Sequence, residues 1–266
     1  MRILSLLLLL CSCAPPALAD RLAFNADTVG DPASDKRAEL SMPPGPGPFP
    51  AVVVLHGCDG VGRHYRIWAA QLRTWGYAAL LVDSFRPRGV INVCNQGMIV
   101  PPLDQAQDAF AAASYLRRLP NIRADRIAVI GFSHGGWAVL KAVLDGTVRQ
   151  DNATPFVAAV AFYPGCQRPE SALATDTLIL IGDADDWTPV QACRRWFDEA
   201  QRAGHSLEMI VYPGALHGFD APHVPSWYAG HYVGRDPQAA SDALSATQKF
   251  LARHLQSLSD HPDKVK

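Results

Sequence analysis

A serine flanked by glycines is the residue whose setting most clearly predicts chemistry in this chain. Ser133 lies in Gly131-Phe132-Ser133-His134-Gly135-Gly136, after the apolar run 126–130 and before the helix-forming run 137–144. This order predicts a buried strand that turns sharply into a helix. That is the setting of a nucleophile elbow, in which a strained serine presents its hydroxyl at the carboxyl edge of a sheet. The alternative is a glycine-rich turn with an inactive serine.

The serine needs a base, because its hydroxyl is a weak nucleophile at neutral pH. His217 follows the last predicted strand of the chain and precedes the closing helix. A loop in that position can reach back over a serine that stands at the edge of the sheet. We therefore predict that His217 is the base.

The base needs a carboxylate to orient it. Asp183, Asp185 and Asp186 follow the apolar run Thr177–Ile181, where a side chain points from a strand end into the cleft. We favour Asp185, which lies four residues before the helix-opening Pro189. Asp183 and Asp186 are the alternatives, and helix capping is the expected role of Asp186.

Attack on a carbonyl group creates an oxyanion that main-chain N–H groups can stabilise. His134 follows the serine at a helix N-terminus and is the first predicted donor. The second is Cys58, in the glycine-containing turn 56–60 that follows the predicted strand Ala51–Leu55. The alternative for this segment is an ordinary connection between a strand and a helix.

Predicted strands and helices alternate along the chain. The strands are 51–55, 77–82, 126–130, 156–163, 177–181 and 206–212, with edge strands within 21–24 and 38–42; the helices are 65–75, 103–119, 134–144, 189–203 and 237–258. A polar break is expected at 146–155. This alternation predicts one α/β domain over residues 20–266, with a mostly parallel sheet covered by helices on both faces.

The first nineteen residues have the order of a secretory signal. Met1-Arg2 precedes the apolar block 3–10, and Ala17-Leu18-Ala19 supplies a small-residue cleavage site. We predict cleavage after Ala19 and a soluble protein that is secreted or periplasmic. A second interpretation is a lipoprotein with Cys13 lipidated. The net charge of −1 and the lack of a basic cluster in the sequence predict neither a nucleic-acid nor a membrane partner.

Five segments together resemble the dienelactone hydrolase family of α/β-hydrolases. They are 55–60, 82–85, 131–136, 182–185 and 216–219. The resemblance extends from about Ala38 to the closing helix. It implies an eight-stranded hydrolase sheet without a metal or an organic cofactor, and a catalytic triad of Ser133, Asp185 and His217.

The chain departs from the name-giving members of that family at several positions. Those members use a cysteine where this chain has Ser133, and a glutamate where it has Gly57. They bind the carboxylate of their substrate with arginines, one of them shortly after the histidine, where this chain has 219–222, Phe-Asp-Ala-Pro. Dienelactone itself is therefore not the expected substrate, although Arg88 or Arg86 could meet an anionic group. The alternative for these arginines is a solvated surface position.

Four cysteines remain after removal of the predicted signal, and export favours their pairing in disulfides. In this fold the strands before Cys58 and Cys94 are neighbours, and so are the elements that carry Cys166 and Cys193. We predict the bridges Cys58–Cys94 and Cys166–Cys193.

The segment 220–236 is rich in proline, glycine and aromatic residues, and we expect neither helix nor strand in it. A long loop that leaves directly from His217 is suited to line a binding pocket. Trp227, Tyr228 and Tyr232 are the candidate pocket residues. The alternative is that they pack the loop onto the closing helix.

These features predict hydrolysis of a small carboxylic ester or lactone through an acyl-enzyme on Ser133. A peptidase or amidase that uses the same triad is one alternative. A secreted binding protein that has this fold without turnover is the other.

Overall fold

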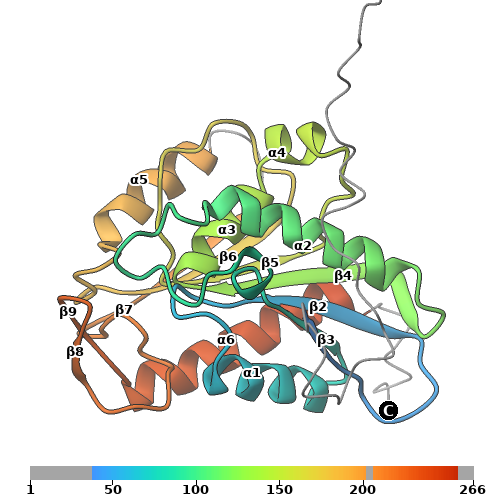
Figure 1. Cartoon of the computed structure of the whole chain (residues 1–266), viewed down its shortest axis with the longest axis horizontal. Coiled ribbons are helices and arrows are strands. Elements are labelled where there is room, and N and C mark those ends of the chain that lie inside the picture. Colours follow the sequence, from blue (N-terminus) through green and yellow to red (C-terminus); the bar gives the residue numbers. More distant parts are fainter. Residues whose placement is uncertain (1–37, 202–205, 257–266) are drawn as a thin grey trace, which may run out of the picture.

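A computed structural model describes residues 38–201 and 206–256 of the chain, and a seven-stranded sheet forms the centre of this part (Figure 1). The strand order is β1-β3-β2-β4-β5-β6-β7. The strands are β1 Ala38–Ser41, β2 Phe49–Leu55, β3 Ala78–Val82, β4 Ile122–Phe132, β5 Ala159–Phe162, β6 Thr177–Gly182 and β7 Leu207–Tyr212. Only β1 runs antiparallel to its neighbour in this sheet, so the prediction of a mostly parallel sheet is confirmed.

The sheet has seven strands within the described residues, against the eight that the resemblance implies for the whole chain. The predicted edge strand at 38–42 is β1, which pairs with β3 at the edge of the sheet. The other predicted edge strand, at 21–24, lies outside the described residues. The described amino-terminal region therefore supplies a single antiparallel edge.

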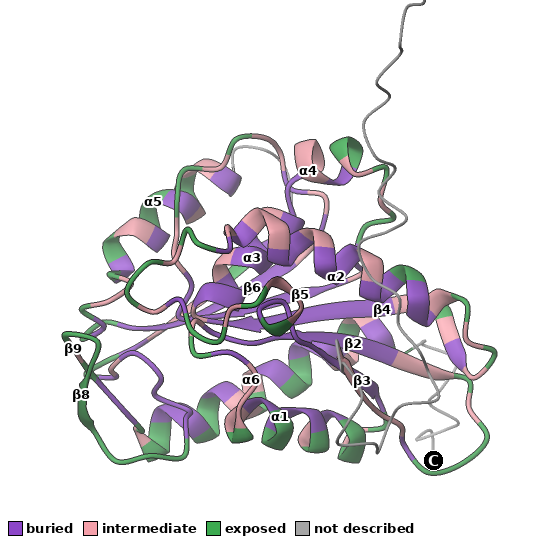
Figure 2. Ribbon diagram, in the orientation of Figure 1, coloured by how far each residue is buried: buried purple, intermediate pink, exposed green. Residues whose placement is uncertain are grey.

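Helices cover both faces of the sheet, with α1 and α6 on one side and α2, α3 and α5 on the other (Figure 1). The helices are α1 Arg63–Thr74, α2 Pro102–Arg117, α3 His134–Ala142, α4 Asp145–Gln150, α5 Val190–Gln201 and α6 Pro237–Leu255, and a 3₁₀ turn, η3, spans Arg86–Arg88. Because both faces of the sheet are covered, its central strands are continuously apolar rather than alternating. Residues 51–55 of β2 are fully buried, as the purple strands in Figure 2 show.

Helix α4 corrects the polar break expected at 146–155. The segment forms a short helix in which Arg149 pairs with Asp145 one turn away, and Val148 is its one buried residue. A six-residue helix with one buried apolar residue has no helical periodicity to detect. Helix α4 is stabilised by packing against the rest of the protein rather than by its own sequence pattern.

The segment 220–236 also differs from expectation, because it contains a β-hairpin. Strand β8, Ser226–Tyr228, pairs antiparallel with β9, His231–Val233. The turn between them has two residues with positive φ, Ala229 at 50° and Gly230 at 86°. Such a turn matches the twist of a tight hairpin. The prolines that argued against a strand precede β8 and leave the ladder intact.

Both predicted disulfides are present. Cys58 is bonded to Cys94 and Cys166 to Cys193, with Cα atoms 4.7 and 4.9 Å apart. The first bridge joins two loops at the carboxyl edge of the sheet. The second joins the loop after β5 to α5.

Candidate active site

Ser133 occupies a strained turn between β4 and α3, as expected of a nucleophile elbow. Its backbone has φ 52° and ψ −112°, in a region that residues other than glycine rarely adopt. Glycine is required on both sides, since a Cβ on Gly131 would lie 2.2 Å from the main-chain oxygen of Gly135. A Cβ on Gly135 would lie 2.5 Å from the oxygen of Leu55. The turn is thus closed by backbone packing that only glycine permits.

The structure brings Ser133, His217 and Asp185 together, although they lie far apart in the sequence. His217 Nε2 lies 2.8 Å from Ser133 Oγ, and His217 Nδ1 lies 2.8 Å from Asp185 Oδ2. The side chains of His217 and Asp185 are 6% and 0% exposed. With its proton on Nδ1, the imidazole donates to the carboxylate and its Nε2 can accept the serine proton.

Asp185 is held in place by the turn that follows β6. Its Oδ1 accepts the main-chain N–H groups of Trp187, at 2.9 Å, and Thr188, at 2.8 Å. Its Oδ2 accepts the hydroxyl of Thr188 at 2.8 Å. Four contacts, counting the one with His217, therefore fix this carboxylate.

The two alternative acids make contacts elsewhere. Asp183 accepts the main-chain N–H of Gly214 at 2.6 Å, and the carboxylate of Asp186 lies 3.3 Å from Nδ1 of His231. Neither of them meets His217 among the contacts of the described residues. Geometry therefore favours Asp185 among the three.

The two predicted oxyanion donors lie in segments fixed by tertiary contacts. Within the described residues, neither the N–H of Cys58 nor that of His134 donates a hydrogen bond to another protein group. The ring of His134 is held between Gly97, whose main-chain oxygen lies 2.9 Å from Nε2, and Gln105, whose Oε1 lies 2.9 Å from Nδ1. Burial lowers the pKa of this imidazole.

A cavity of about 260 Å³ opens over Ser133 and His217. Aromatic side chains form much of its wall, among them Tyr65, Tyr163, Trp187 and Tyr228; Asp59 and His64 also line it. The volume lies at the small end of ligand sites, which suits a small substrate.

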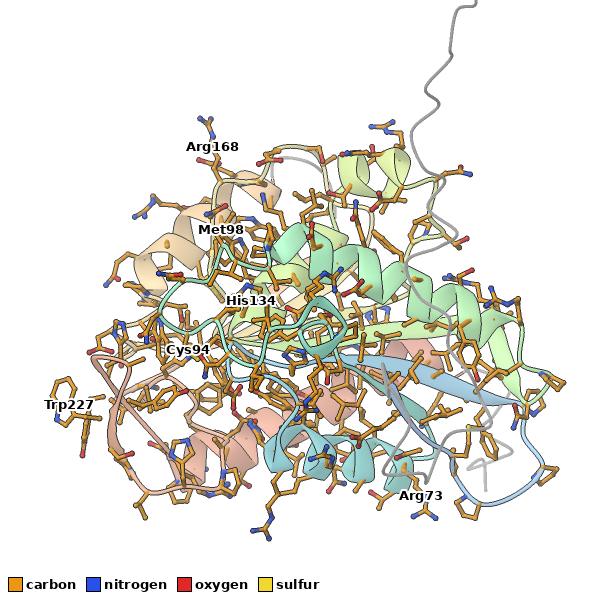
Figure 3. All side chains as sticks on the ribbon, viewed as in Figure 1. Arg73, Cys94, Met98, His134, Arg168 and Trp227 are labelled. Atoms are coloured by element: carbon orange, nitrogen blue, oxygen red, sulfur yellow. A yellow bond between two sulfur atoms is a disulfide. The ribbon has the colours of Figure 1, made fainter. Side chains whose placement is uncertain are left out.

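The structure separates two predicted pocket residues that are neighbours in sequence. Tyr228 lines the cavity, and its hydroxyl accepts a hydrogen bond from Asn92 at 3.0 Å. Trp227 does not line it: the residue is 73% exposed and points away from the body of the protein (Figure 3). Its ring contacts that of Tyr232, on the opposite strand of the hairpin. Alternation along β8 explains the difference, because successive side chains of a strand face opposite sides.

Arg88 does not line the cavity either. Its guanidinium makes two hydrogen bonds to the buried carboxylate of Asp108, at 2.7 and 3.0 Å, and one to the main-chain oxygen of Ser84 at 2.7 Å. Such a bidentate pair holds the arginine in place. Three of its donors are therefore engaged with Asp108 and Ser84, and this arrangement does not support the prediction that Arg88 binds substrate.

Sequence reasoning did not single out Asp220, which lies buried three residues after His217. Its carboxylate accepts hydrogen bonds from His64 at 2.8 Å, Trp68 at 2.7 Å and Tyr163 at 2.8 Å. Burial alone would lower the pKa of His64 and raise that of Asp220, but their attraction reverses both shifts. Both shifts favour the charged forms, and the contact fastens the loop after His217 to α1. The available signal was a lone acid in an otherwise apolar stretch.

The strand order, the strained turn at Ser133 and the succession of serine, aspartate and histidine along the chain are typical of the α/β-hydrolase fold. The chain belongs to the dienelactone hydrolase family, whose profile matches residues 37–255. The resemblance noted in the sequence is thereby confirmed.

A curated relative from Bradyrhizobium, named "Probable 2-oxo-3-(5-oxofuran-2-ylidene)propanoate lactonase", is 27% identical over 255 residues, which is 89% of this chain and 96% of the relative. Two solved structures share the fold. One is a dienelactone hydrolase-like promiscuous phosphotriesterase from metagenomic libraries, with a TM-score of 0.66, 22% identity and coverage of 82% of this chain and 92% of that one. The other is a propionate-bound esterase from Thermogutta terrifontis, with a TM-score of 0.62, 19% identity and coverage of 83% and 90%.

Proposed function

We propose that this protein is a serine hydrolase that cleaves small carboxylic esters or lactones through an acyl-enzyme on Ser133. The observation that carries the proposal is the continuous contact from Ser133 Oγ through His217 to Asp185, at 2.8 Å for each step. Membership of a family of ester and lactone hydrolases supports the reaction class.

In this mechanism His217 Nε2 takes the proton of Ser133 as the hydroxyl attacks the carbonyl carbon of the substrate. The N–H groups of His134 and Cys58 stabilise the oxyanion. The imidazolium, stabilised by Asp185, then returns the proton to the departing alcohol, which leaves an ester on Ser133. Water, deprotonated by the same histidine, releases the acid and restores the serine.

Competing substrates test the reaction class. p-Nitrophenyl acetate and butyrate and a γ-lactone are to be compared with aminoacyl p-nitroanilides, using the wild type and Ser133→Ala. We expect turnover of the esters and the lactone, and its loss in the variant. Preference for the anilides would replace the proposal with a peptidase or amidase.

Covalent labelling tests the nucleophile directly. A fluorophosphonate should add to Ser133, and peptide mass spectrometry should locate the adduct there. The absence of both turnover and labelling would instead indicate a binding protein with this fold.

We also propose that the chain is exported after cleavage of residues 1–19, which lie outside the described residues. The two disulfides support this, because such bonds persist in oxidising compartments. No helix within 38–201 and 206–256 is long and apolar enough to cross a membrane. Mass spectrometry of the exported protein should find Asp20 as its first residue. A lipidated Cys13 at the N-terminus would show the lipoprotein alternative instead.

A further inference from the structure

Asp59 places a carboxylate in the wall of the cavity that contains Ser133. It lies in the turn after β2, and its Oδ1 accepts the hydroxyl of Tyr65 at 2.6 Å. Burial, together with the charge of Asp59, holds the pKa of the Tyr65 hydroxyl well above its ordinary value. Tyr65 therefore remains a donor, and it fixes the position of the carboxylate.

The carboxylate of Asp59 lies near the turn that carries Ser133. A Cβ built on Gly57 would lie 3.3 Å from Asp59 Oδ1 and 2.7 Å from the Tyr65 hydroxyl. The same point is 3.4 Å from the main-chain oxygen of Phe132, the residue before Ser133. Asp59 and Tyr65 thus fill the space that a side chain at position 57 would take beside Phe132.

Asp59 is exposed, and the other charges around the cavity balance its negative charge only in part. No lysine or arginine is among the described residues that line it. His64 lines it, and it interacts most strongly with the buried carboxylate of Asp220, 2.8 Å away, and more weakly with Asp59. Arg235 donates to the main-chain oxygen of Asp220 and lies outside the lining. Within the described residues, Oδ2 of Asp59 has no hydrogen bond or ion pair.

Aromatic rings in the wall of the cavity also favour a positively charged ligand. Tyr163, Trp187 and Tyr228 line the cavity, and the negative face of an aromatic ring attracts cations. The rings of Trp187 and Tyr228 lie 6.1 Å apart at the cavity wall. A carboxylate with neighbouring aromatic rings is a surface that attracts an ammonium group and repels a carboxylate.

We propose that Asp59 determines the substrate class of this site, which selects cationic over neutral and neutral over anionic acyl groups. The inference rests on the proposed hydrolase function. It predicts that esters carrying a free carboxylate are the poorest substrates of this chain.

Three p-nitrophenyl esters of matched length test the order. Their acyl groups are 4-(trimethylammonio)butanoyl, its neutral isostere 5,5-dimethylhexanoyl, and glutaryl with a free carboxylate. We expect the glutaryl ester to have a kcat/KM about tenfold below the neutral ester at low ionic strength, the size expected for one partly screened charge. The cationic ester should exceed the neutral one, and added salt should narrow both ratios.

Asp59→Asn removes the charge and keeps an acceptor for Tyr65, so it should bring all three esters to within about threefold of one another by removing that one charge. Asp125→Asn is the matched control. It removes the same charge near the start of β4, at the end of the strand that is far from Ser133. That variant should keep the wild-type ratios. Tyr65→Phe retains the charge and should keep the order of the three esters.

Ser133→Ala separates the two proposals. If the wild type cleaves the esters and Ser133→Ala does not, the function stands and the three ratios alone decide the role of Asp59. Equal rates for the charged and neutral esters, or ratios unchanged in Asp59→Asn, would overturn that role. The primary amides of the three acids, tested by thermal shift on Ser133→Ala, measure the same preference without turnover: stabilisation in the order cation, neutral, anion supports the inference, and any other order overturns it.

Discussion

Cys58 and Cys94 are joined by a disulfide that connects the loop after β2 to the segment 89–100. The same segment holds Cys58 a second time, since the N–H of Val93 donates to the main-chain oxygen of Cys58 at 2.8 Å. It also contacts the ring of His134 through the oxygen of Gly97. One segment therefore braces both residues that we propose as oxyanion donors.

Removal of this bridge should reduce turnover more than removal of the other. The two disulfides close loops of similar length, with sequence separations of 36 and 27 residues, so each should stabilise the fold by about 3.5–4 kcal/mol in the loop-entropy model. Cys58→Ser/Cys94→Ser should lower kcat about tenfold with little change in KM, because the oxyanion donors lose their alignment. Cys166→Ser/Cys193→Ser is the control matched in stability. Equal kcat in the two double variants, measured well below their melting temperatures, would contradict the bracing role.

The contact between Ser133 and His217 predicts that the two residues act as a unit. Ser133→Ala and His217→Ala should each lower kcat by about 10³-fold or more, and the double variant should be hardly worse. Ester hydrolysis measured for all three variants gives the comparison. Additive losses in the double variant would show that the two residues act separately.

The three aspartates after β6 should differ sharply in their effect. Asp185→Asn should lower kcat by about 10²-fold or more, because the amide favours the wrong tautomer of His217. Asp183→Asn and Asp186→Asn should keep most of the activity, since these side chains contact Gly214 and His231 instead. An inactive Asp186→Asn with an active Asp185→Asn would reverse the assignment of the acid.

Tyr228 and Trp227 should differ although they are adjacent. Tyr228→Ala enlarges the cavity and should change the ratio of kcat/KM between p-nitrophenyl acetate and hexanoate by about three- to tenfold. Trp227→Ala should leave this ratio unchanged, because the side chain lies outside the cavity. A larger change in the Trp227 variant would mean that the hairpin closes over bound substrate.

The ion pair between His64 and Asp220 should make stability depend on pH. The pKa of His64 is raised above its ordinary value of 6.5, so its contribution is complete below pH 6.5 and is lost as the pH rises through the raised pKa. The pKa of Asp220 is lowered from 3.8, so its contribution is lost only as the pH falls below that value. The ion pair therefore stabilises the folded protein most between pH 3.8 and pH 6.5.

His64→Gln tests this dependence by calorimetry at pH 5.5 and pH 9. The variant should melt about 3–8 °C below the wild type at pH 5.5, from the usual strength of hydrogen bonds to charged groups, and the difference should shrink at pH 9. His254→Gln is the control, because burial lowers the pKa of His254 and its effect should follow the opposite trend. A difference that grows towards pH 9 for His64→Gln would contradict the ionic pair.

Much of the fold and of the candidate site could be predicted because it depends on local properties of the chain. Residues 51–55 identify a buried strand by their own side chains, and the glycines around Ser133 are required by the turn that contains them. The succession of Ser133, Asp185 and His217 follows from the order of the elements that carry them. The disulfide pairing followed from the same topology.

Contacts between distant residues were decided by the tertiary structure alone. Asp220 meets His64 across 156 positions of sequence, and Arg88 meets Asp108 where substrate binding had been expected. The two strands of the hairpin at 226–233 pair with each other, but each is too short to show an alternation of apolar and polar residues in the sequence. The pattern of apolar residues in the sequence predicts which residues are buried. A buried charge, however, is tolerated only beside its partner. Which partner that is depends on the packing of whole elements, and no local pattern of side chains encodes it.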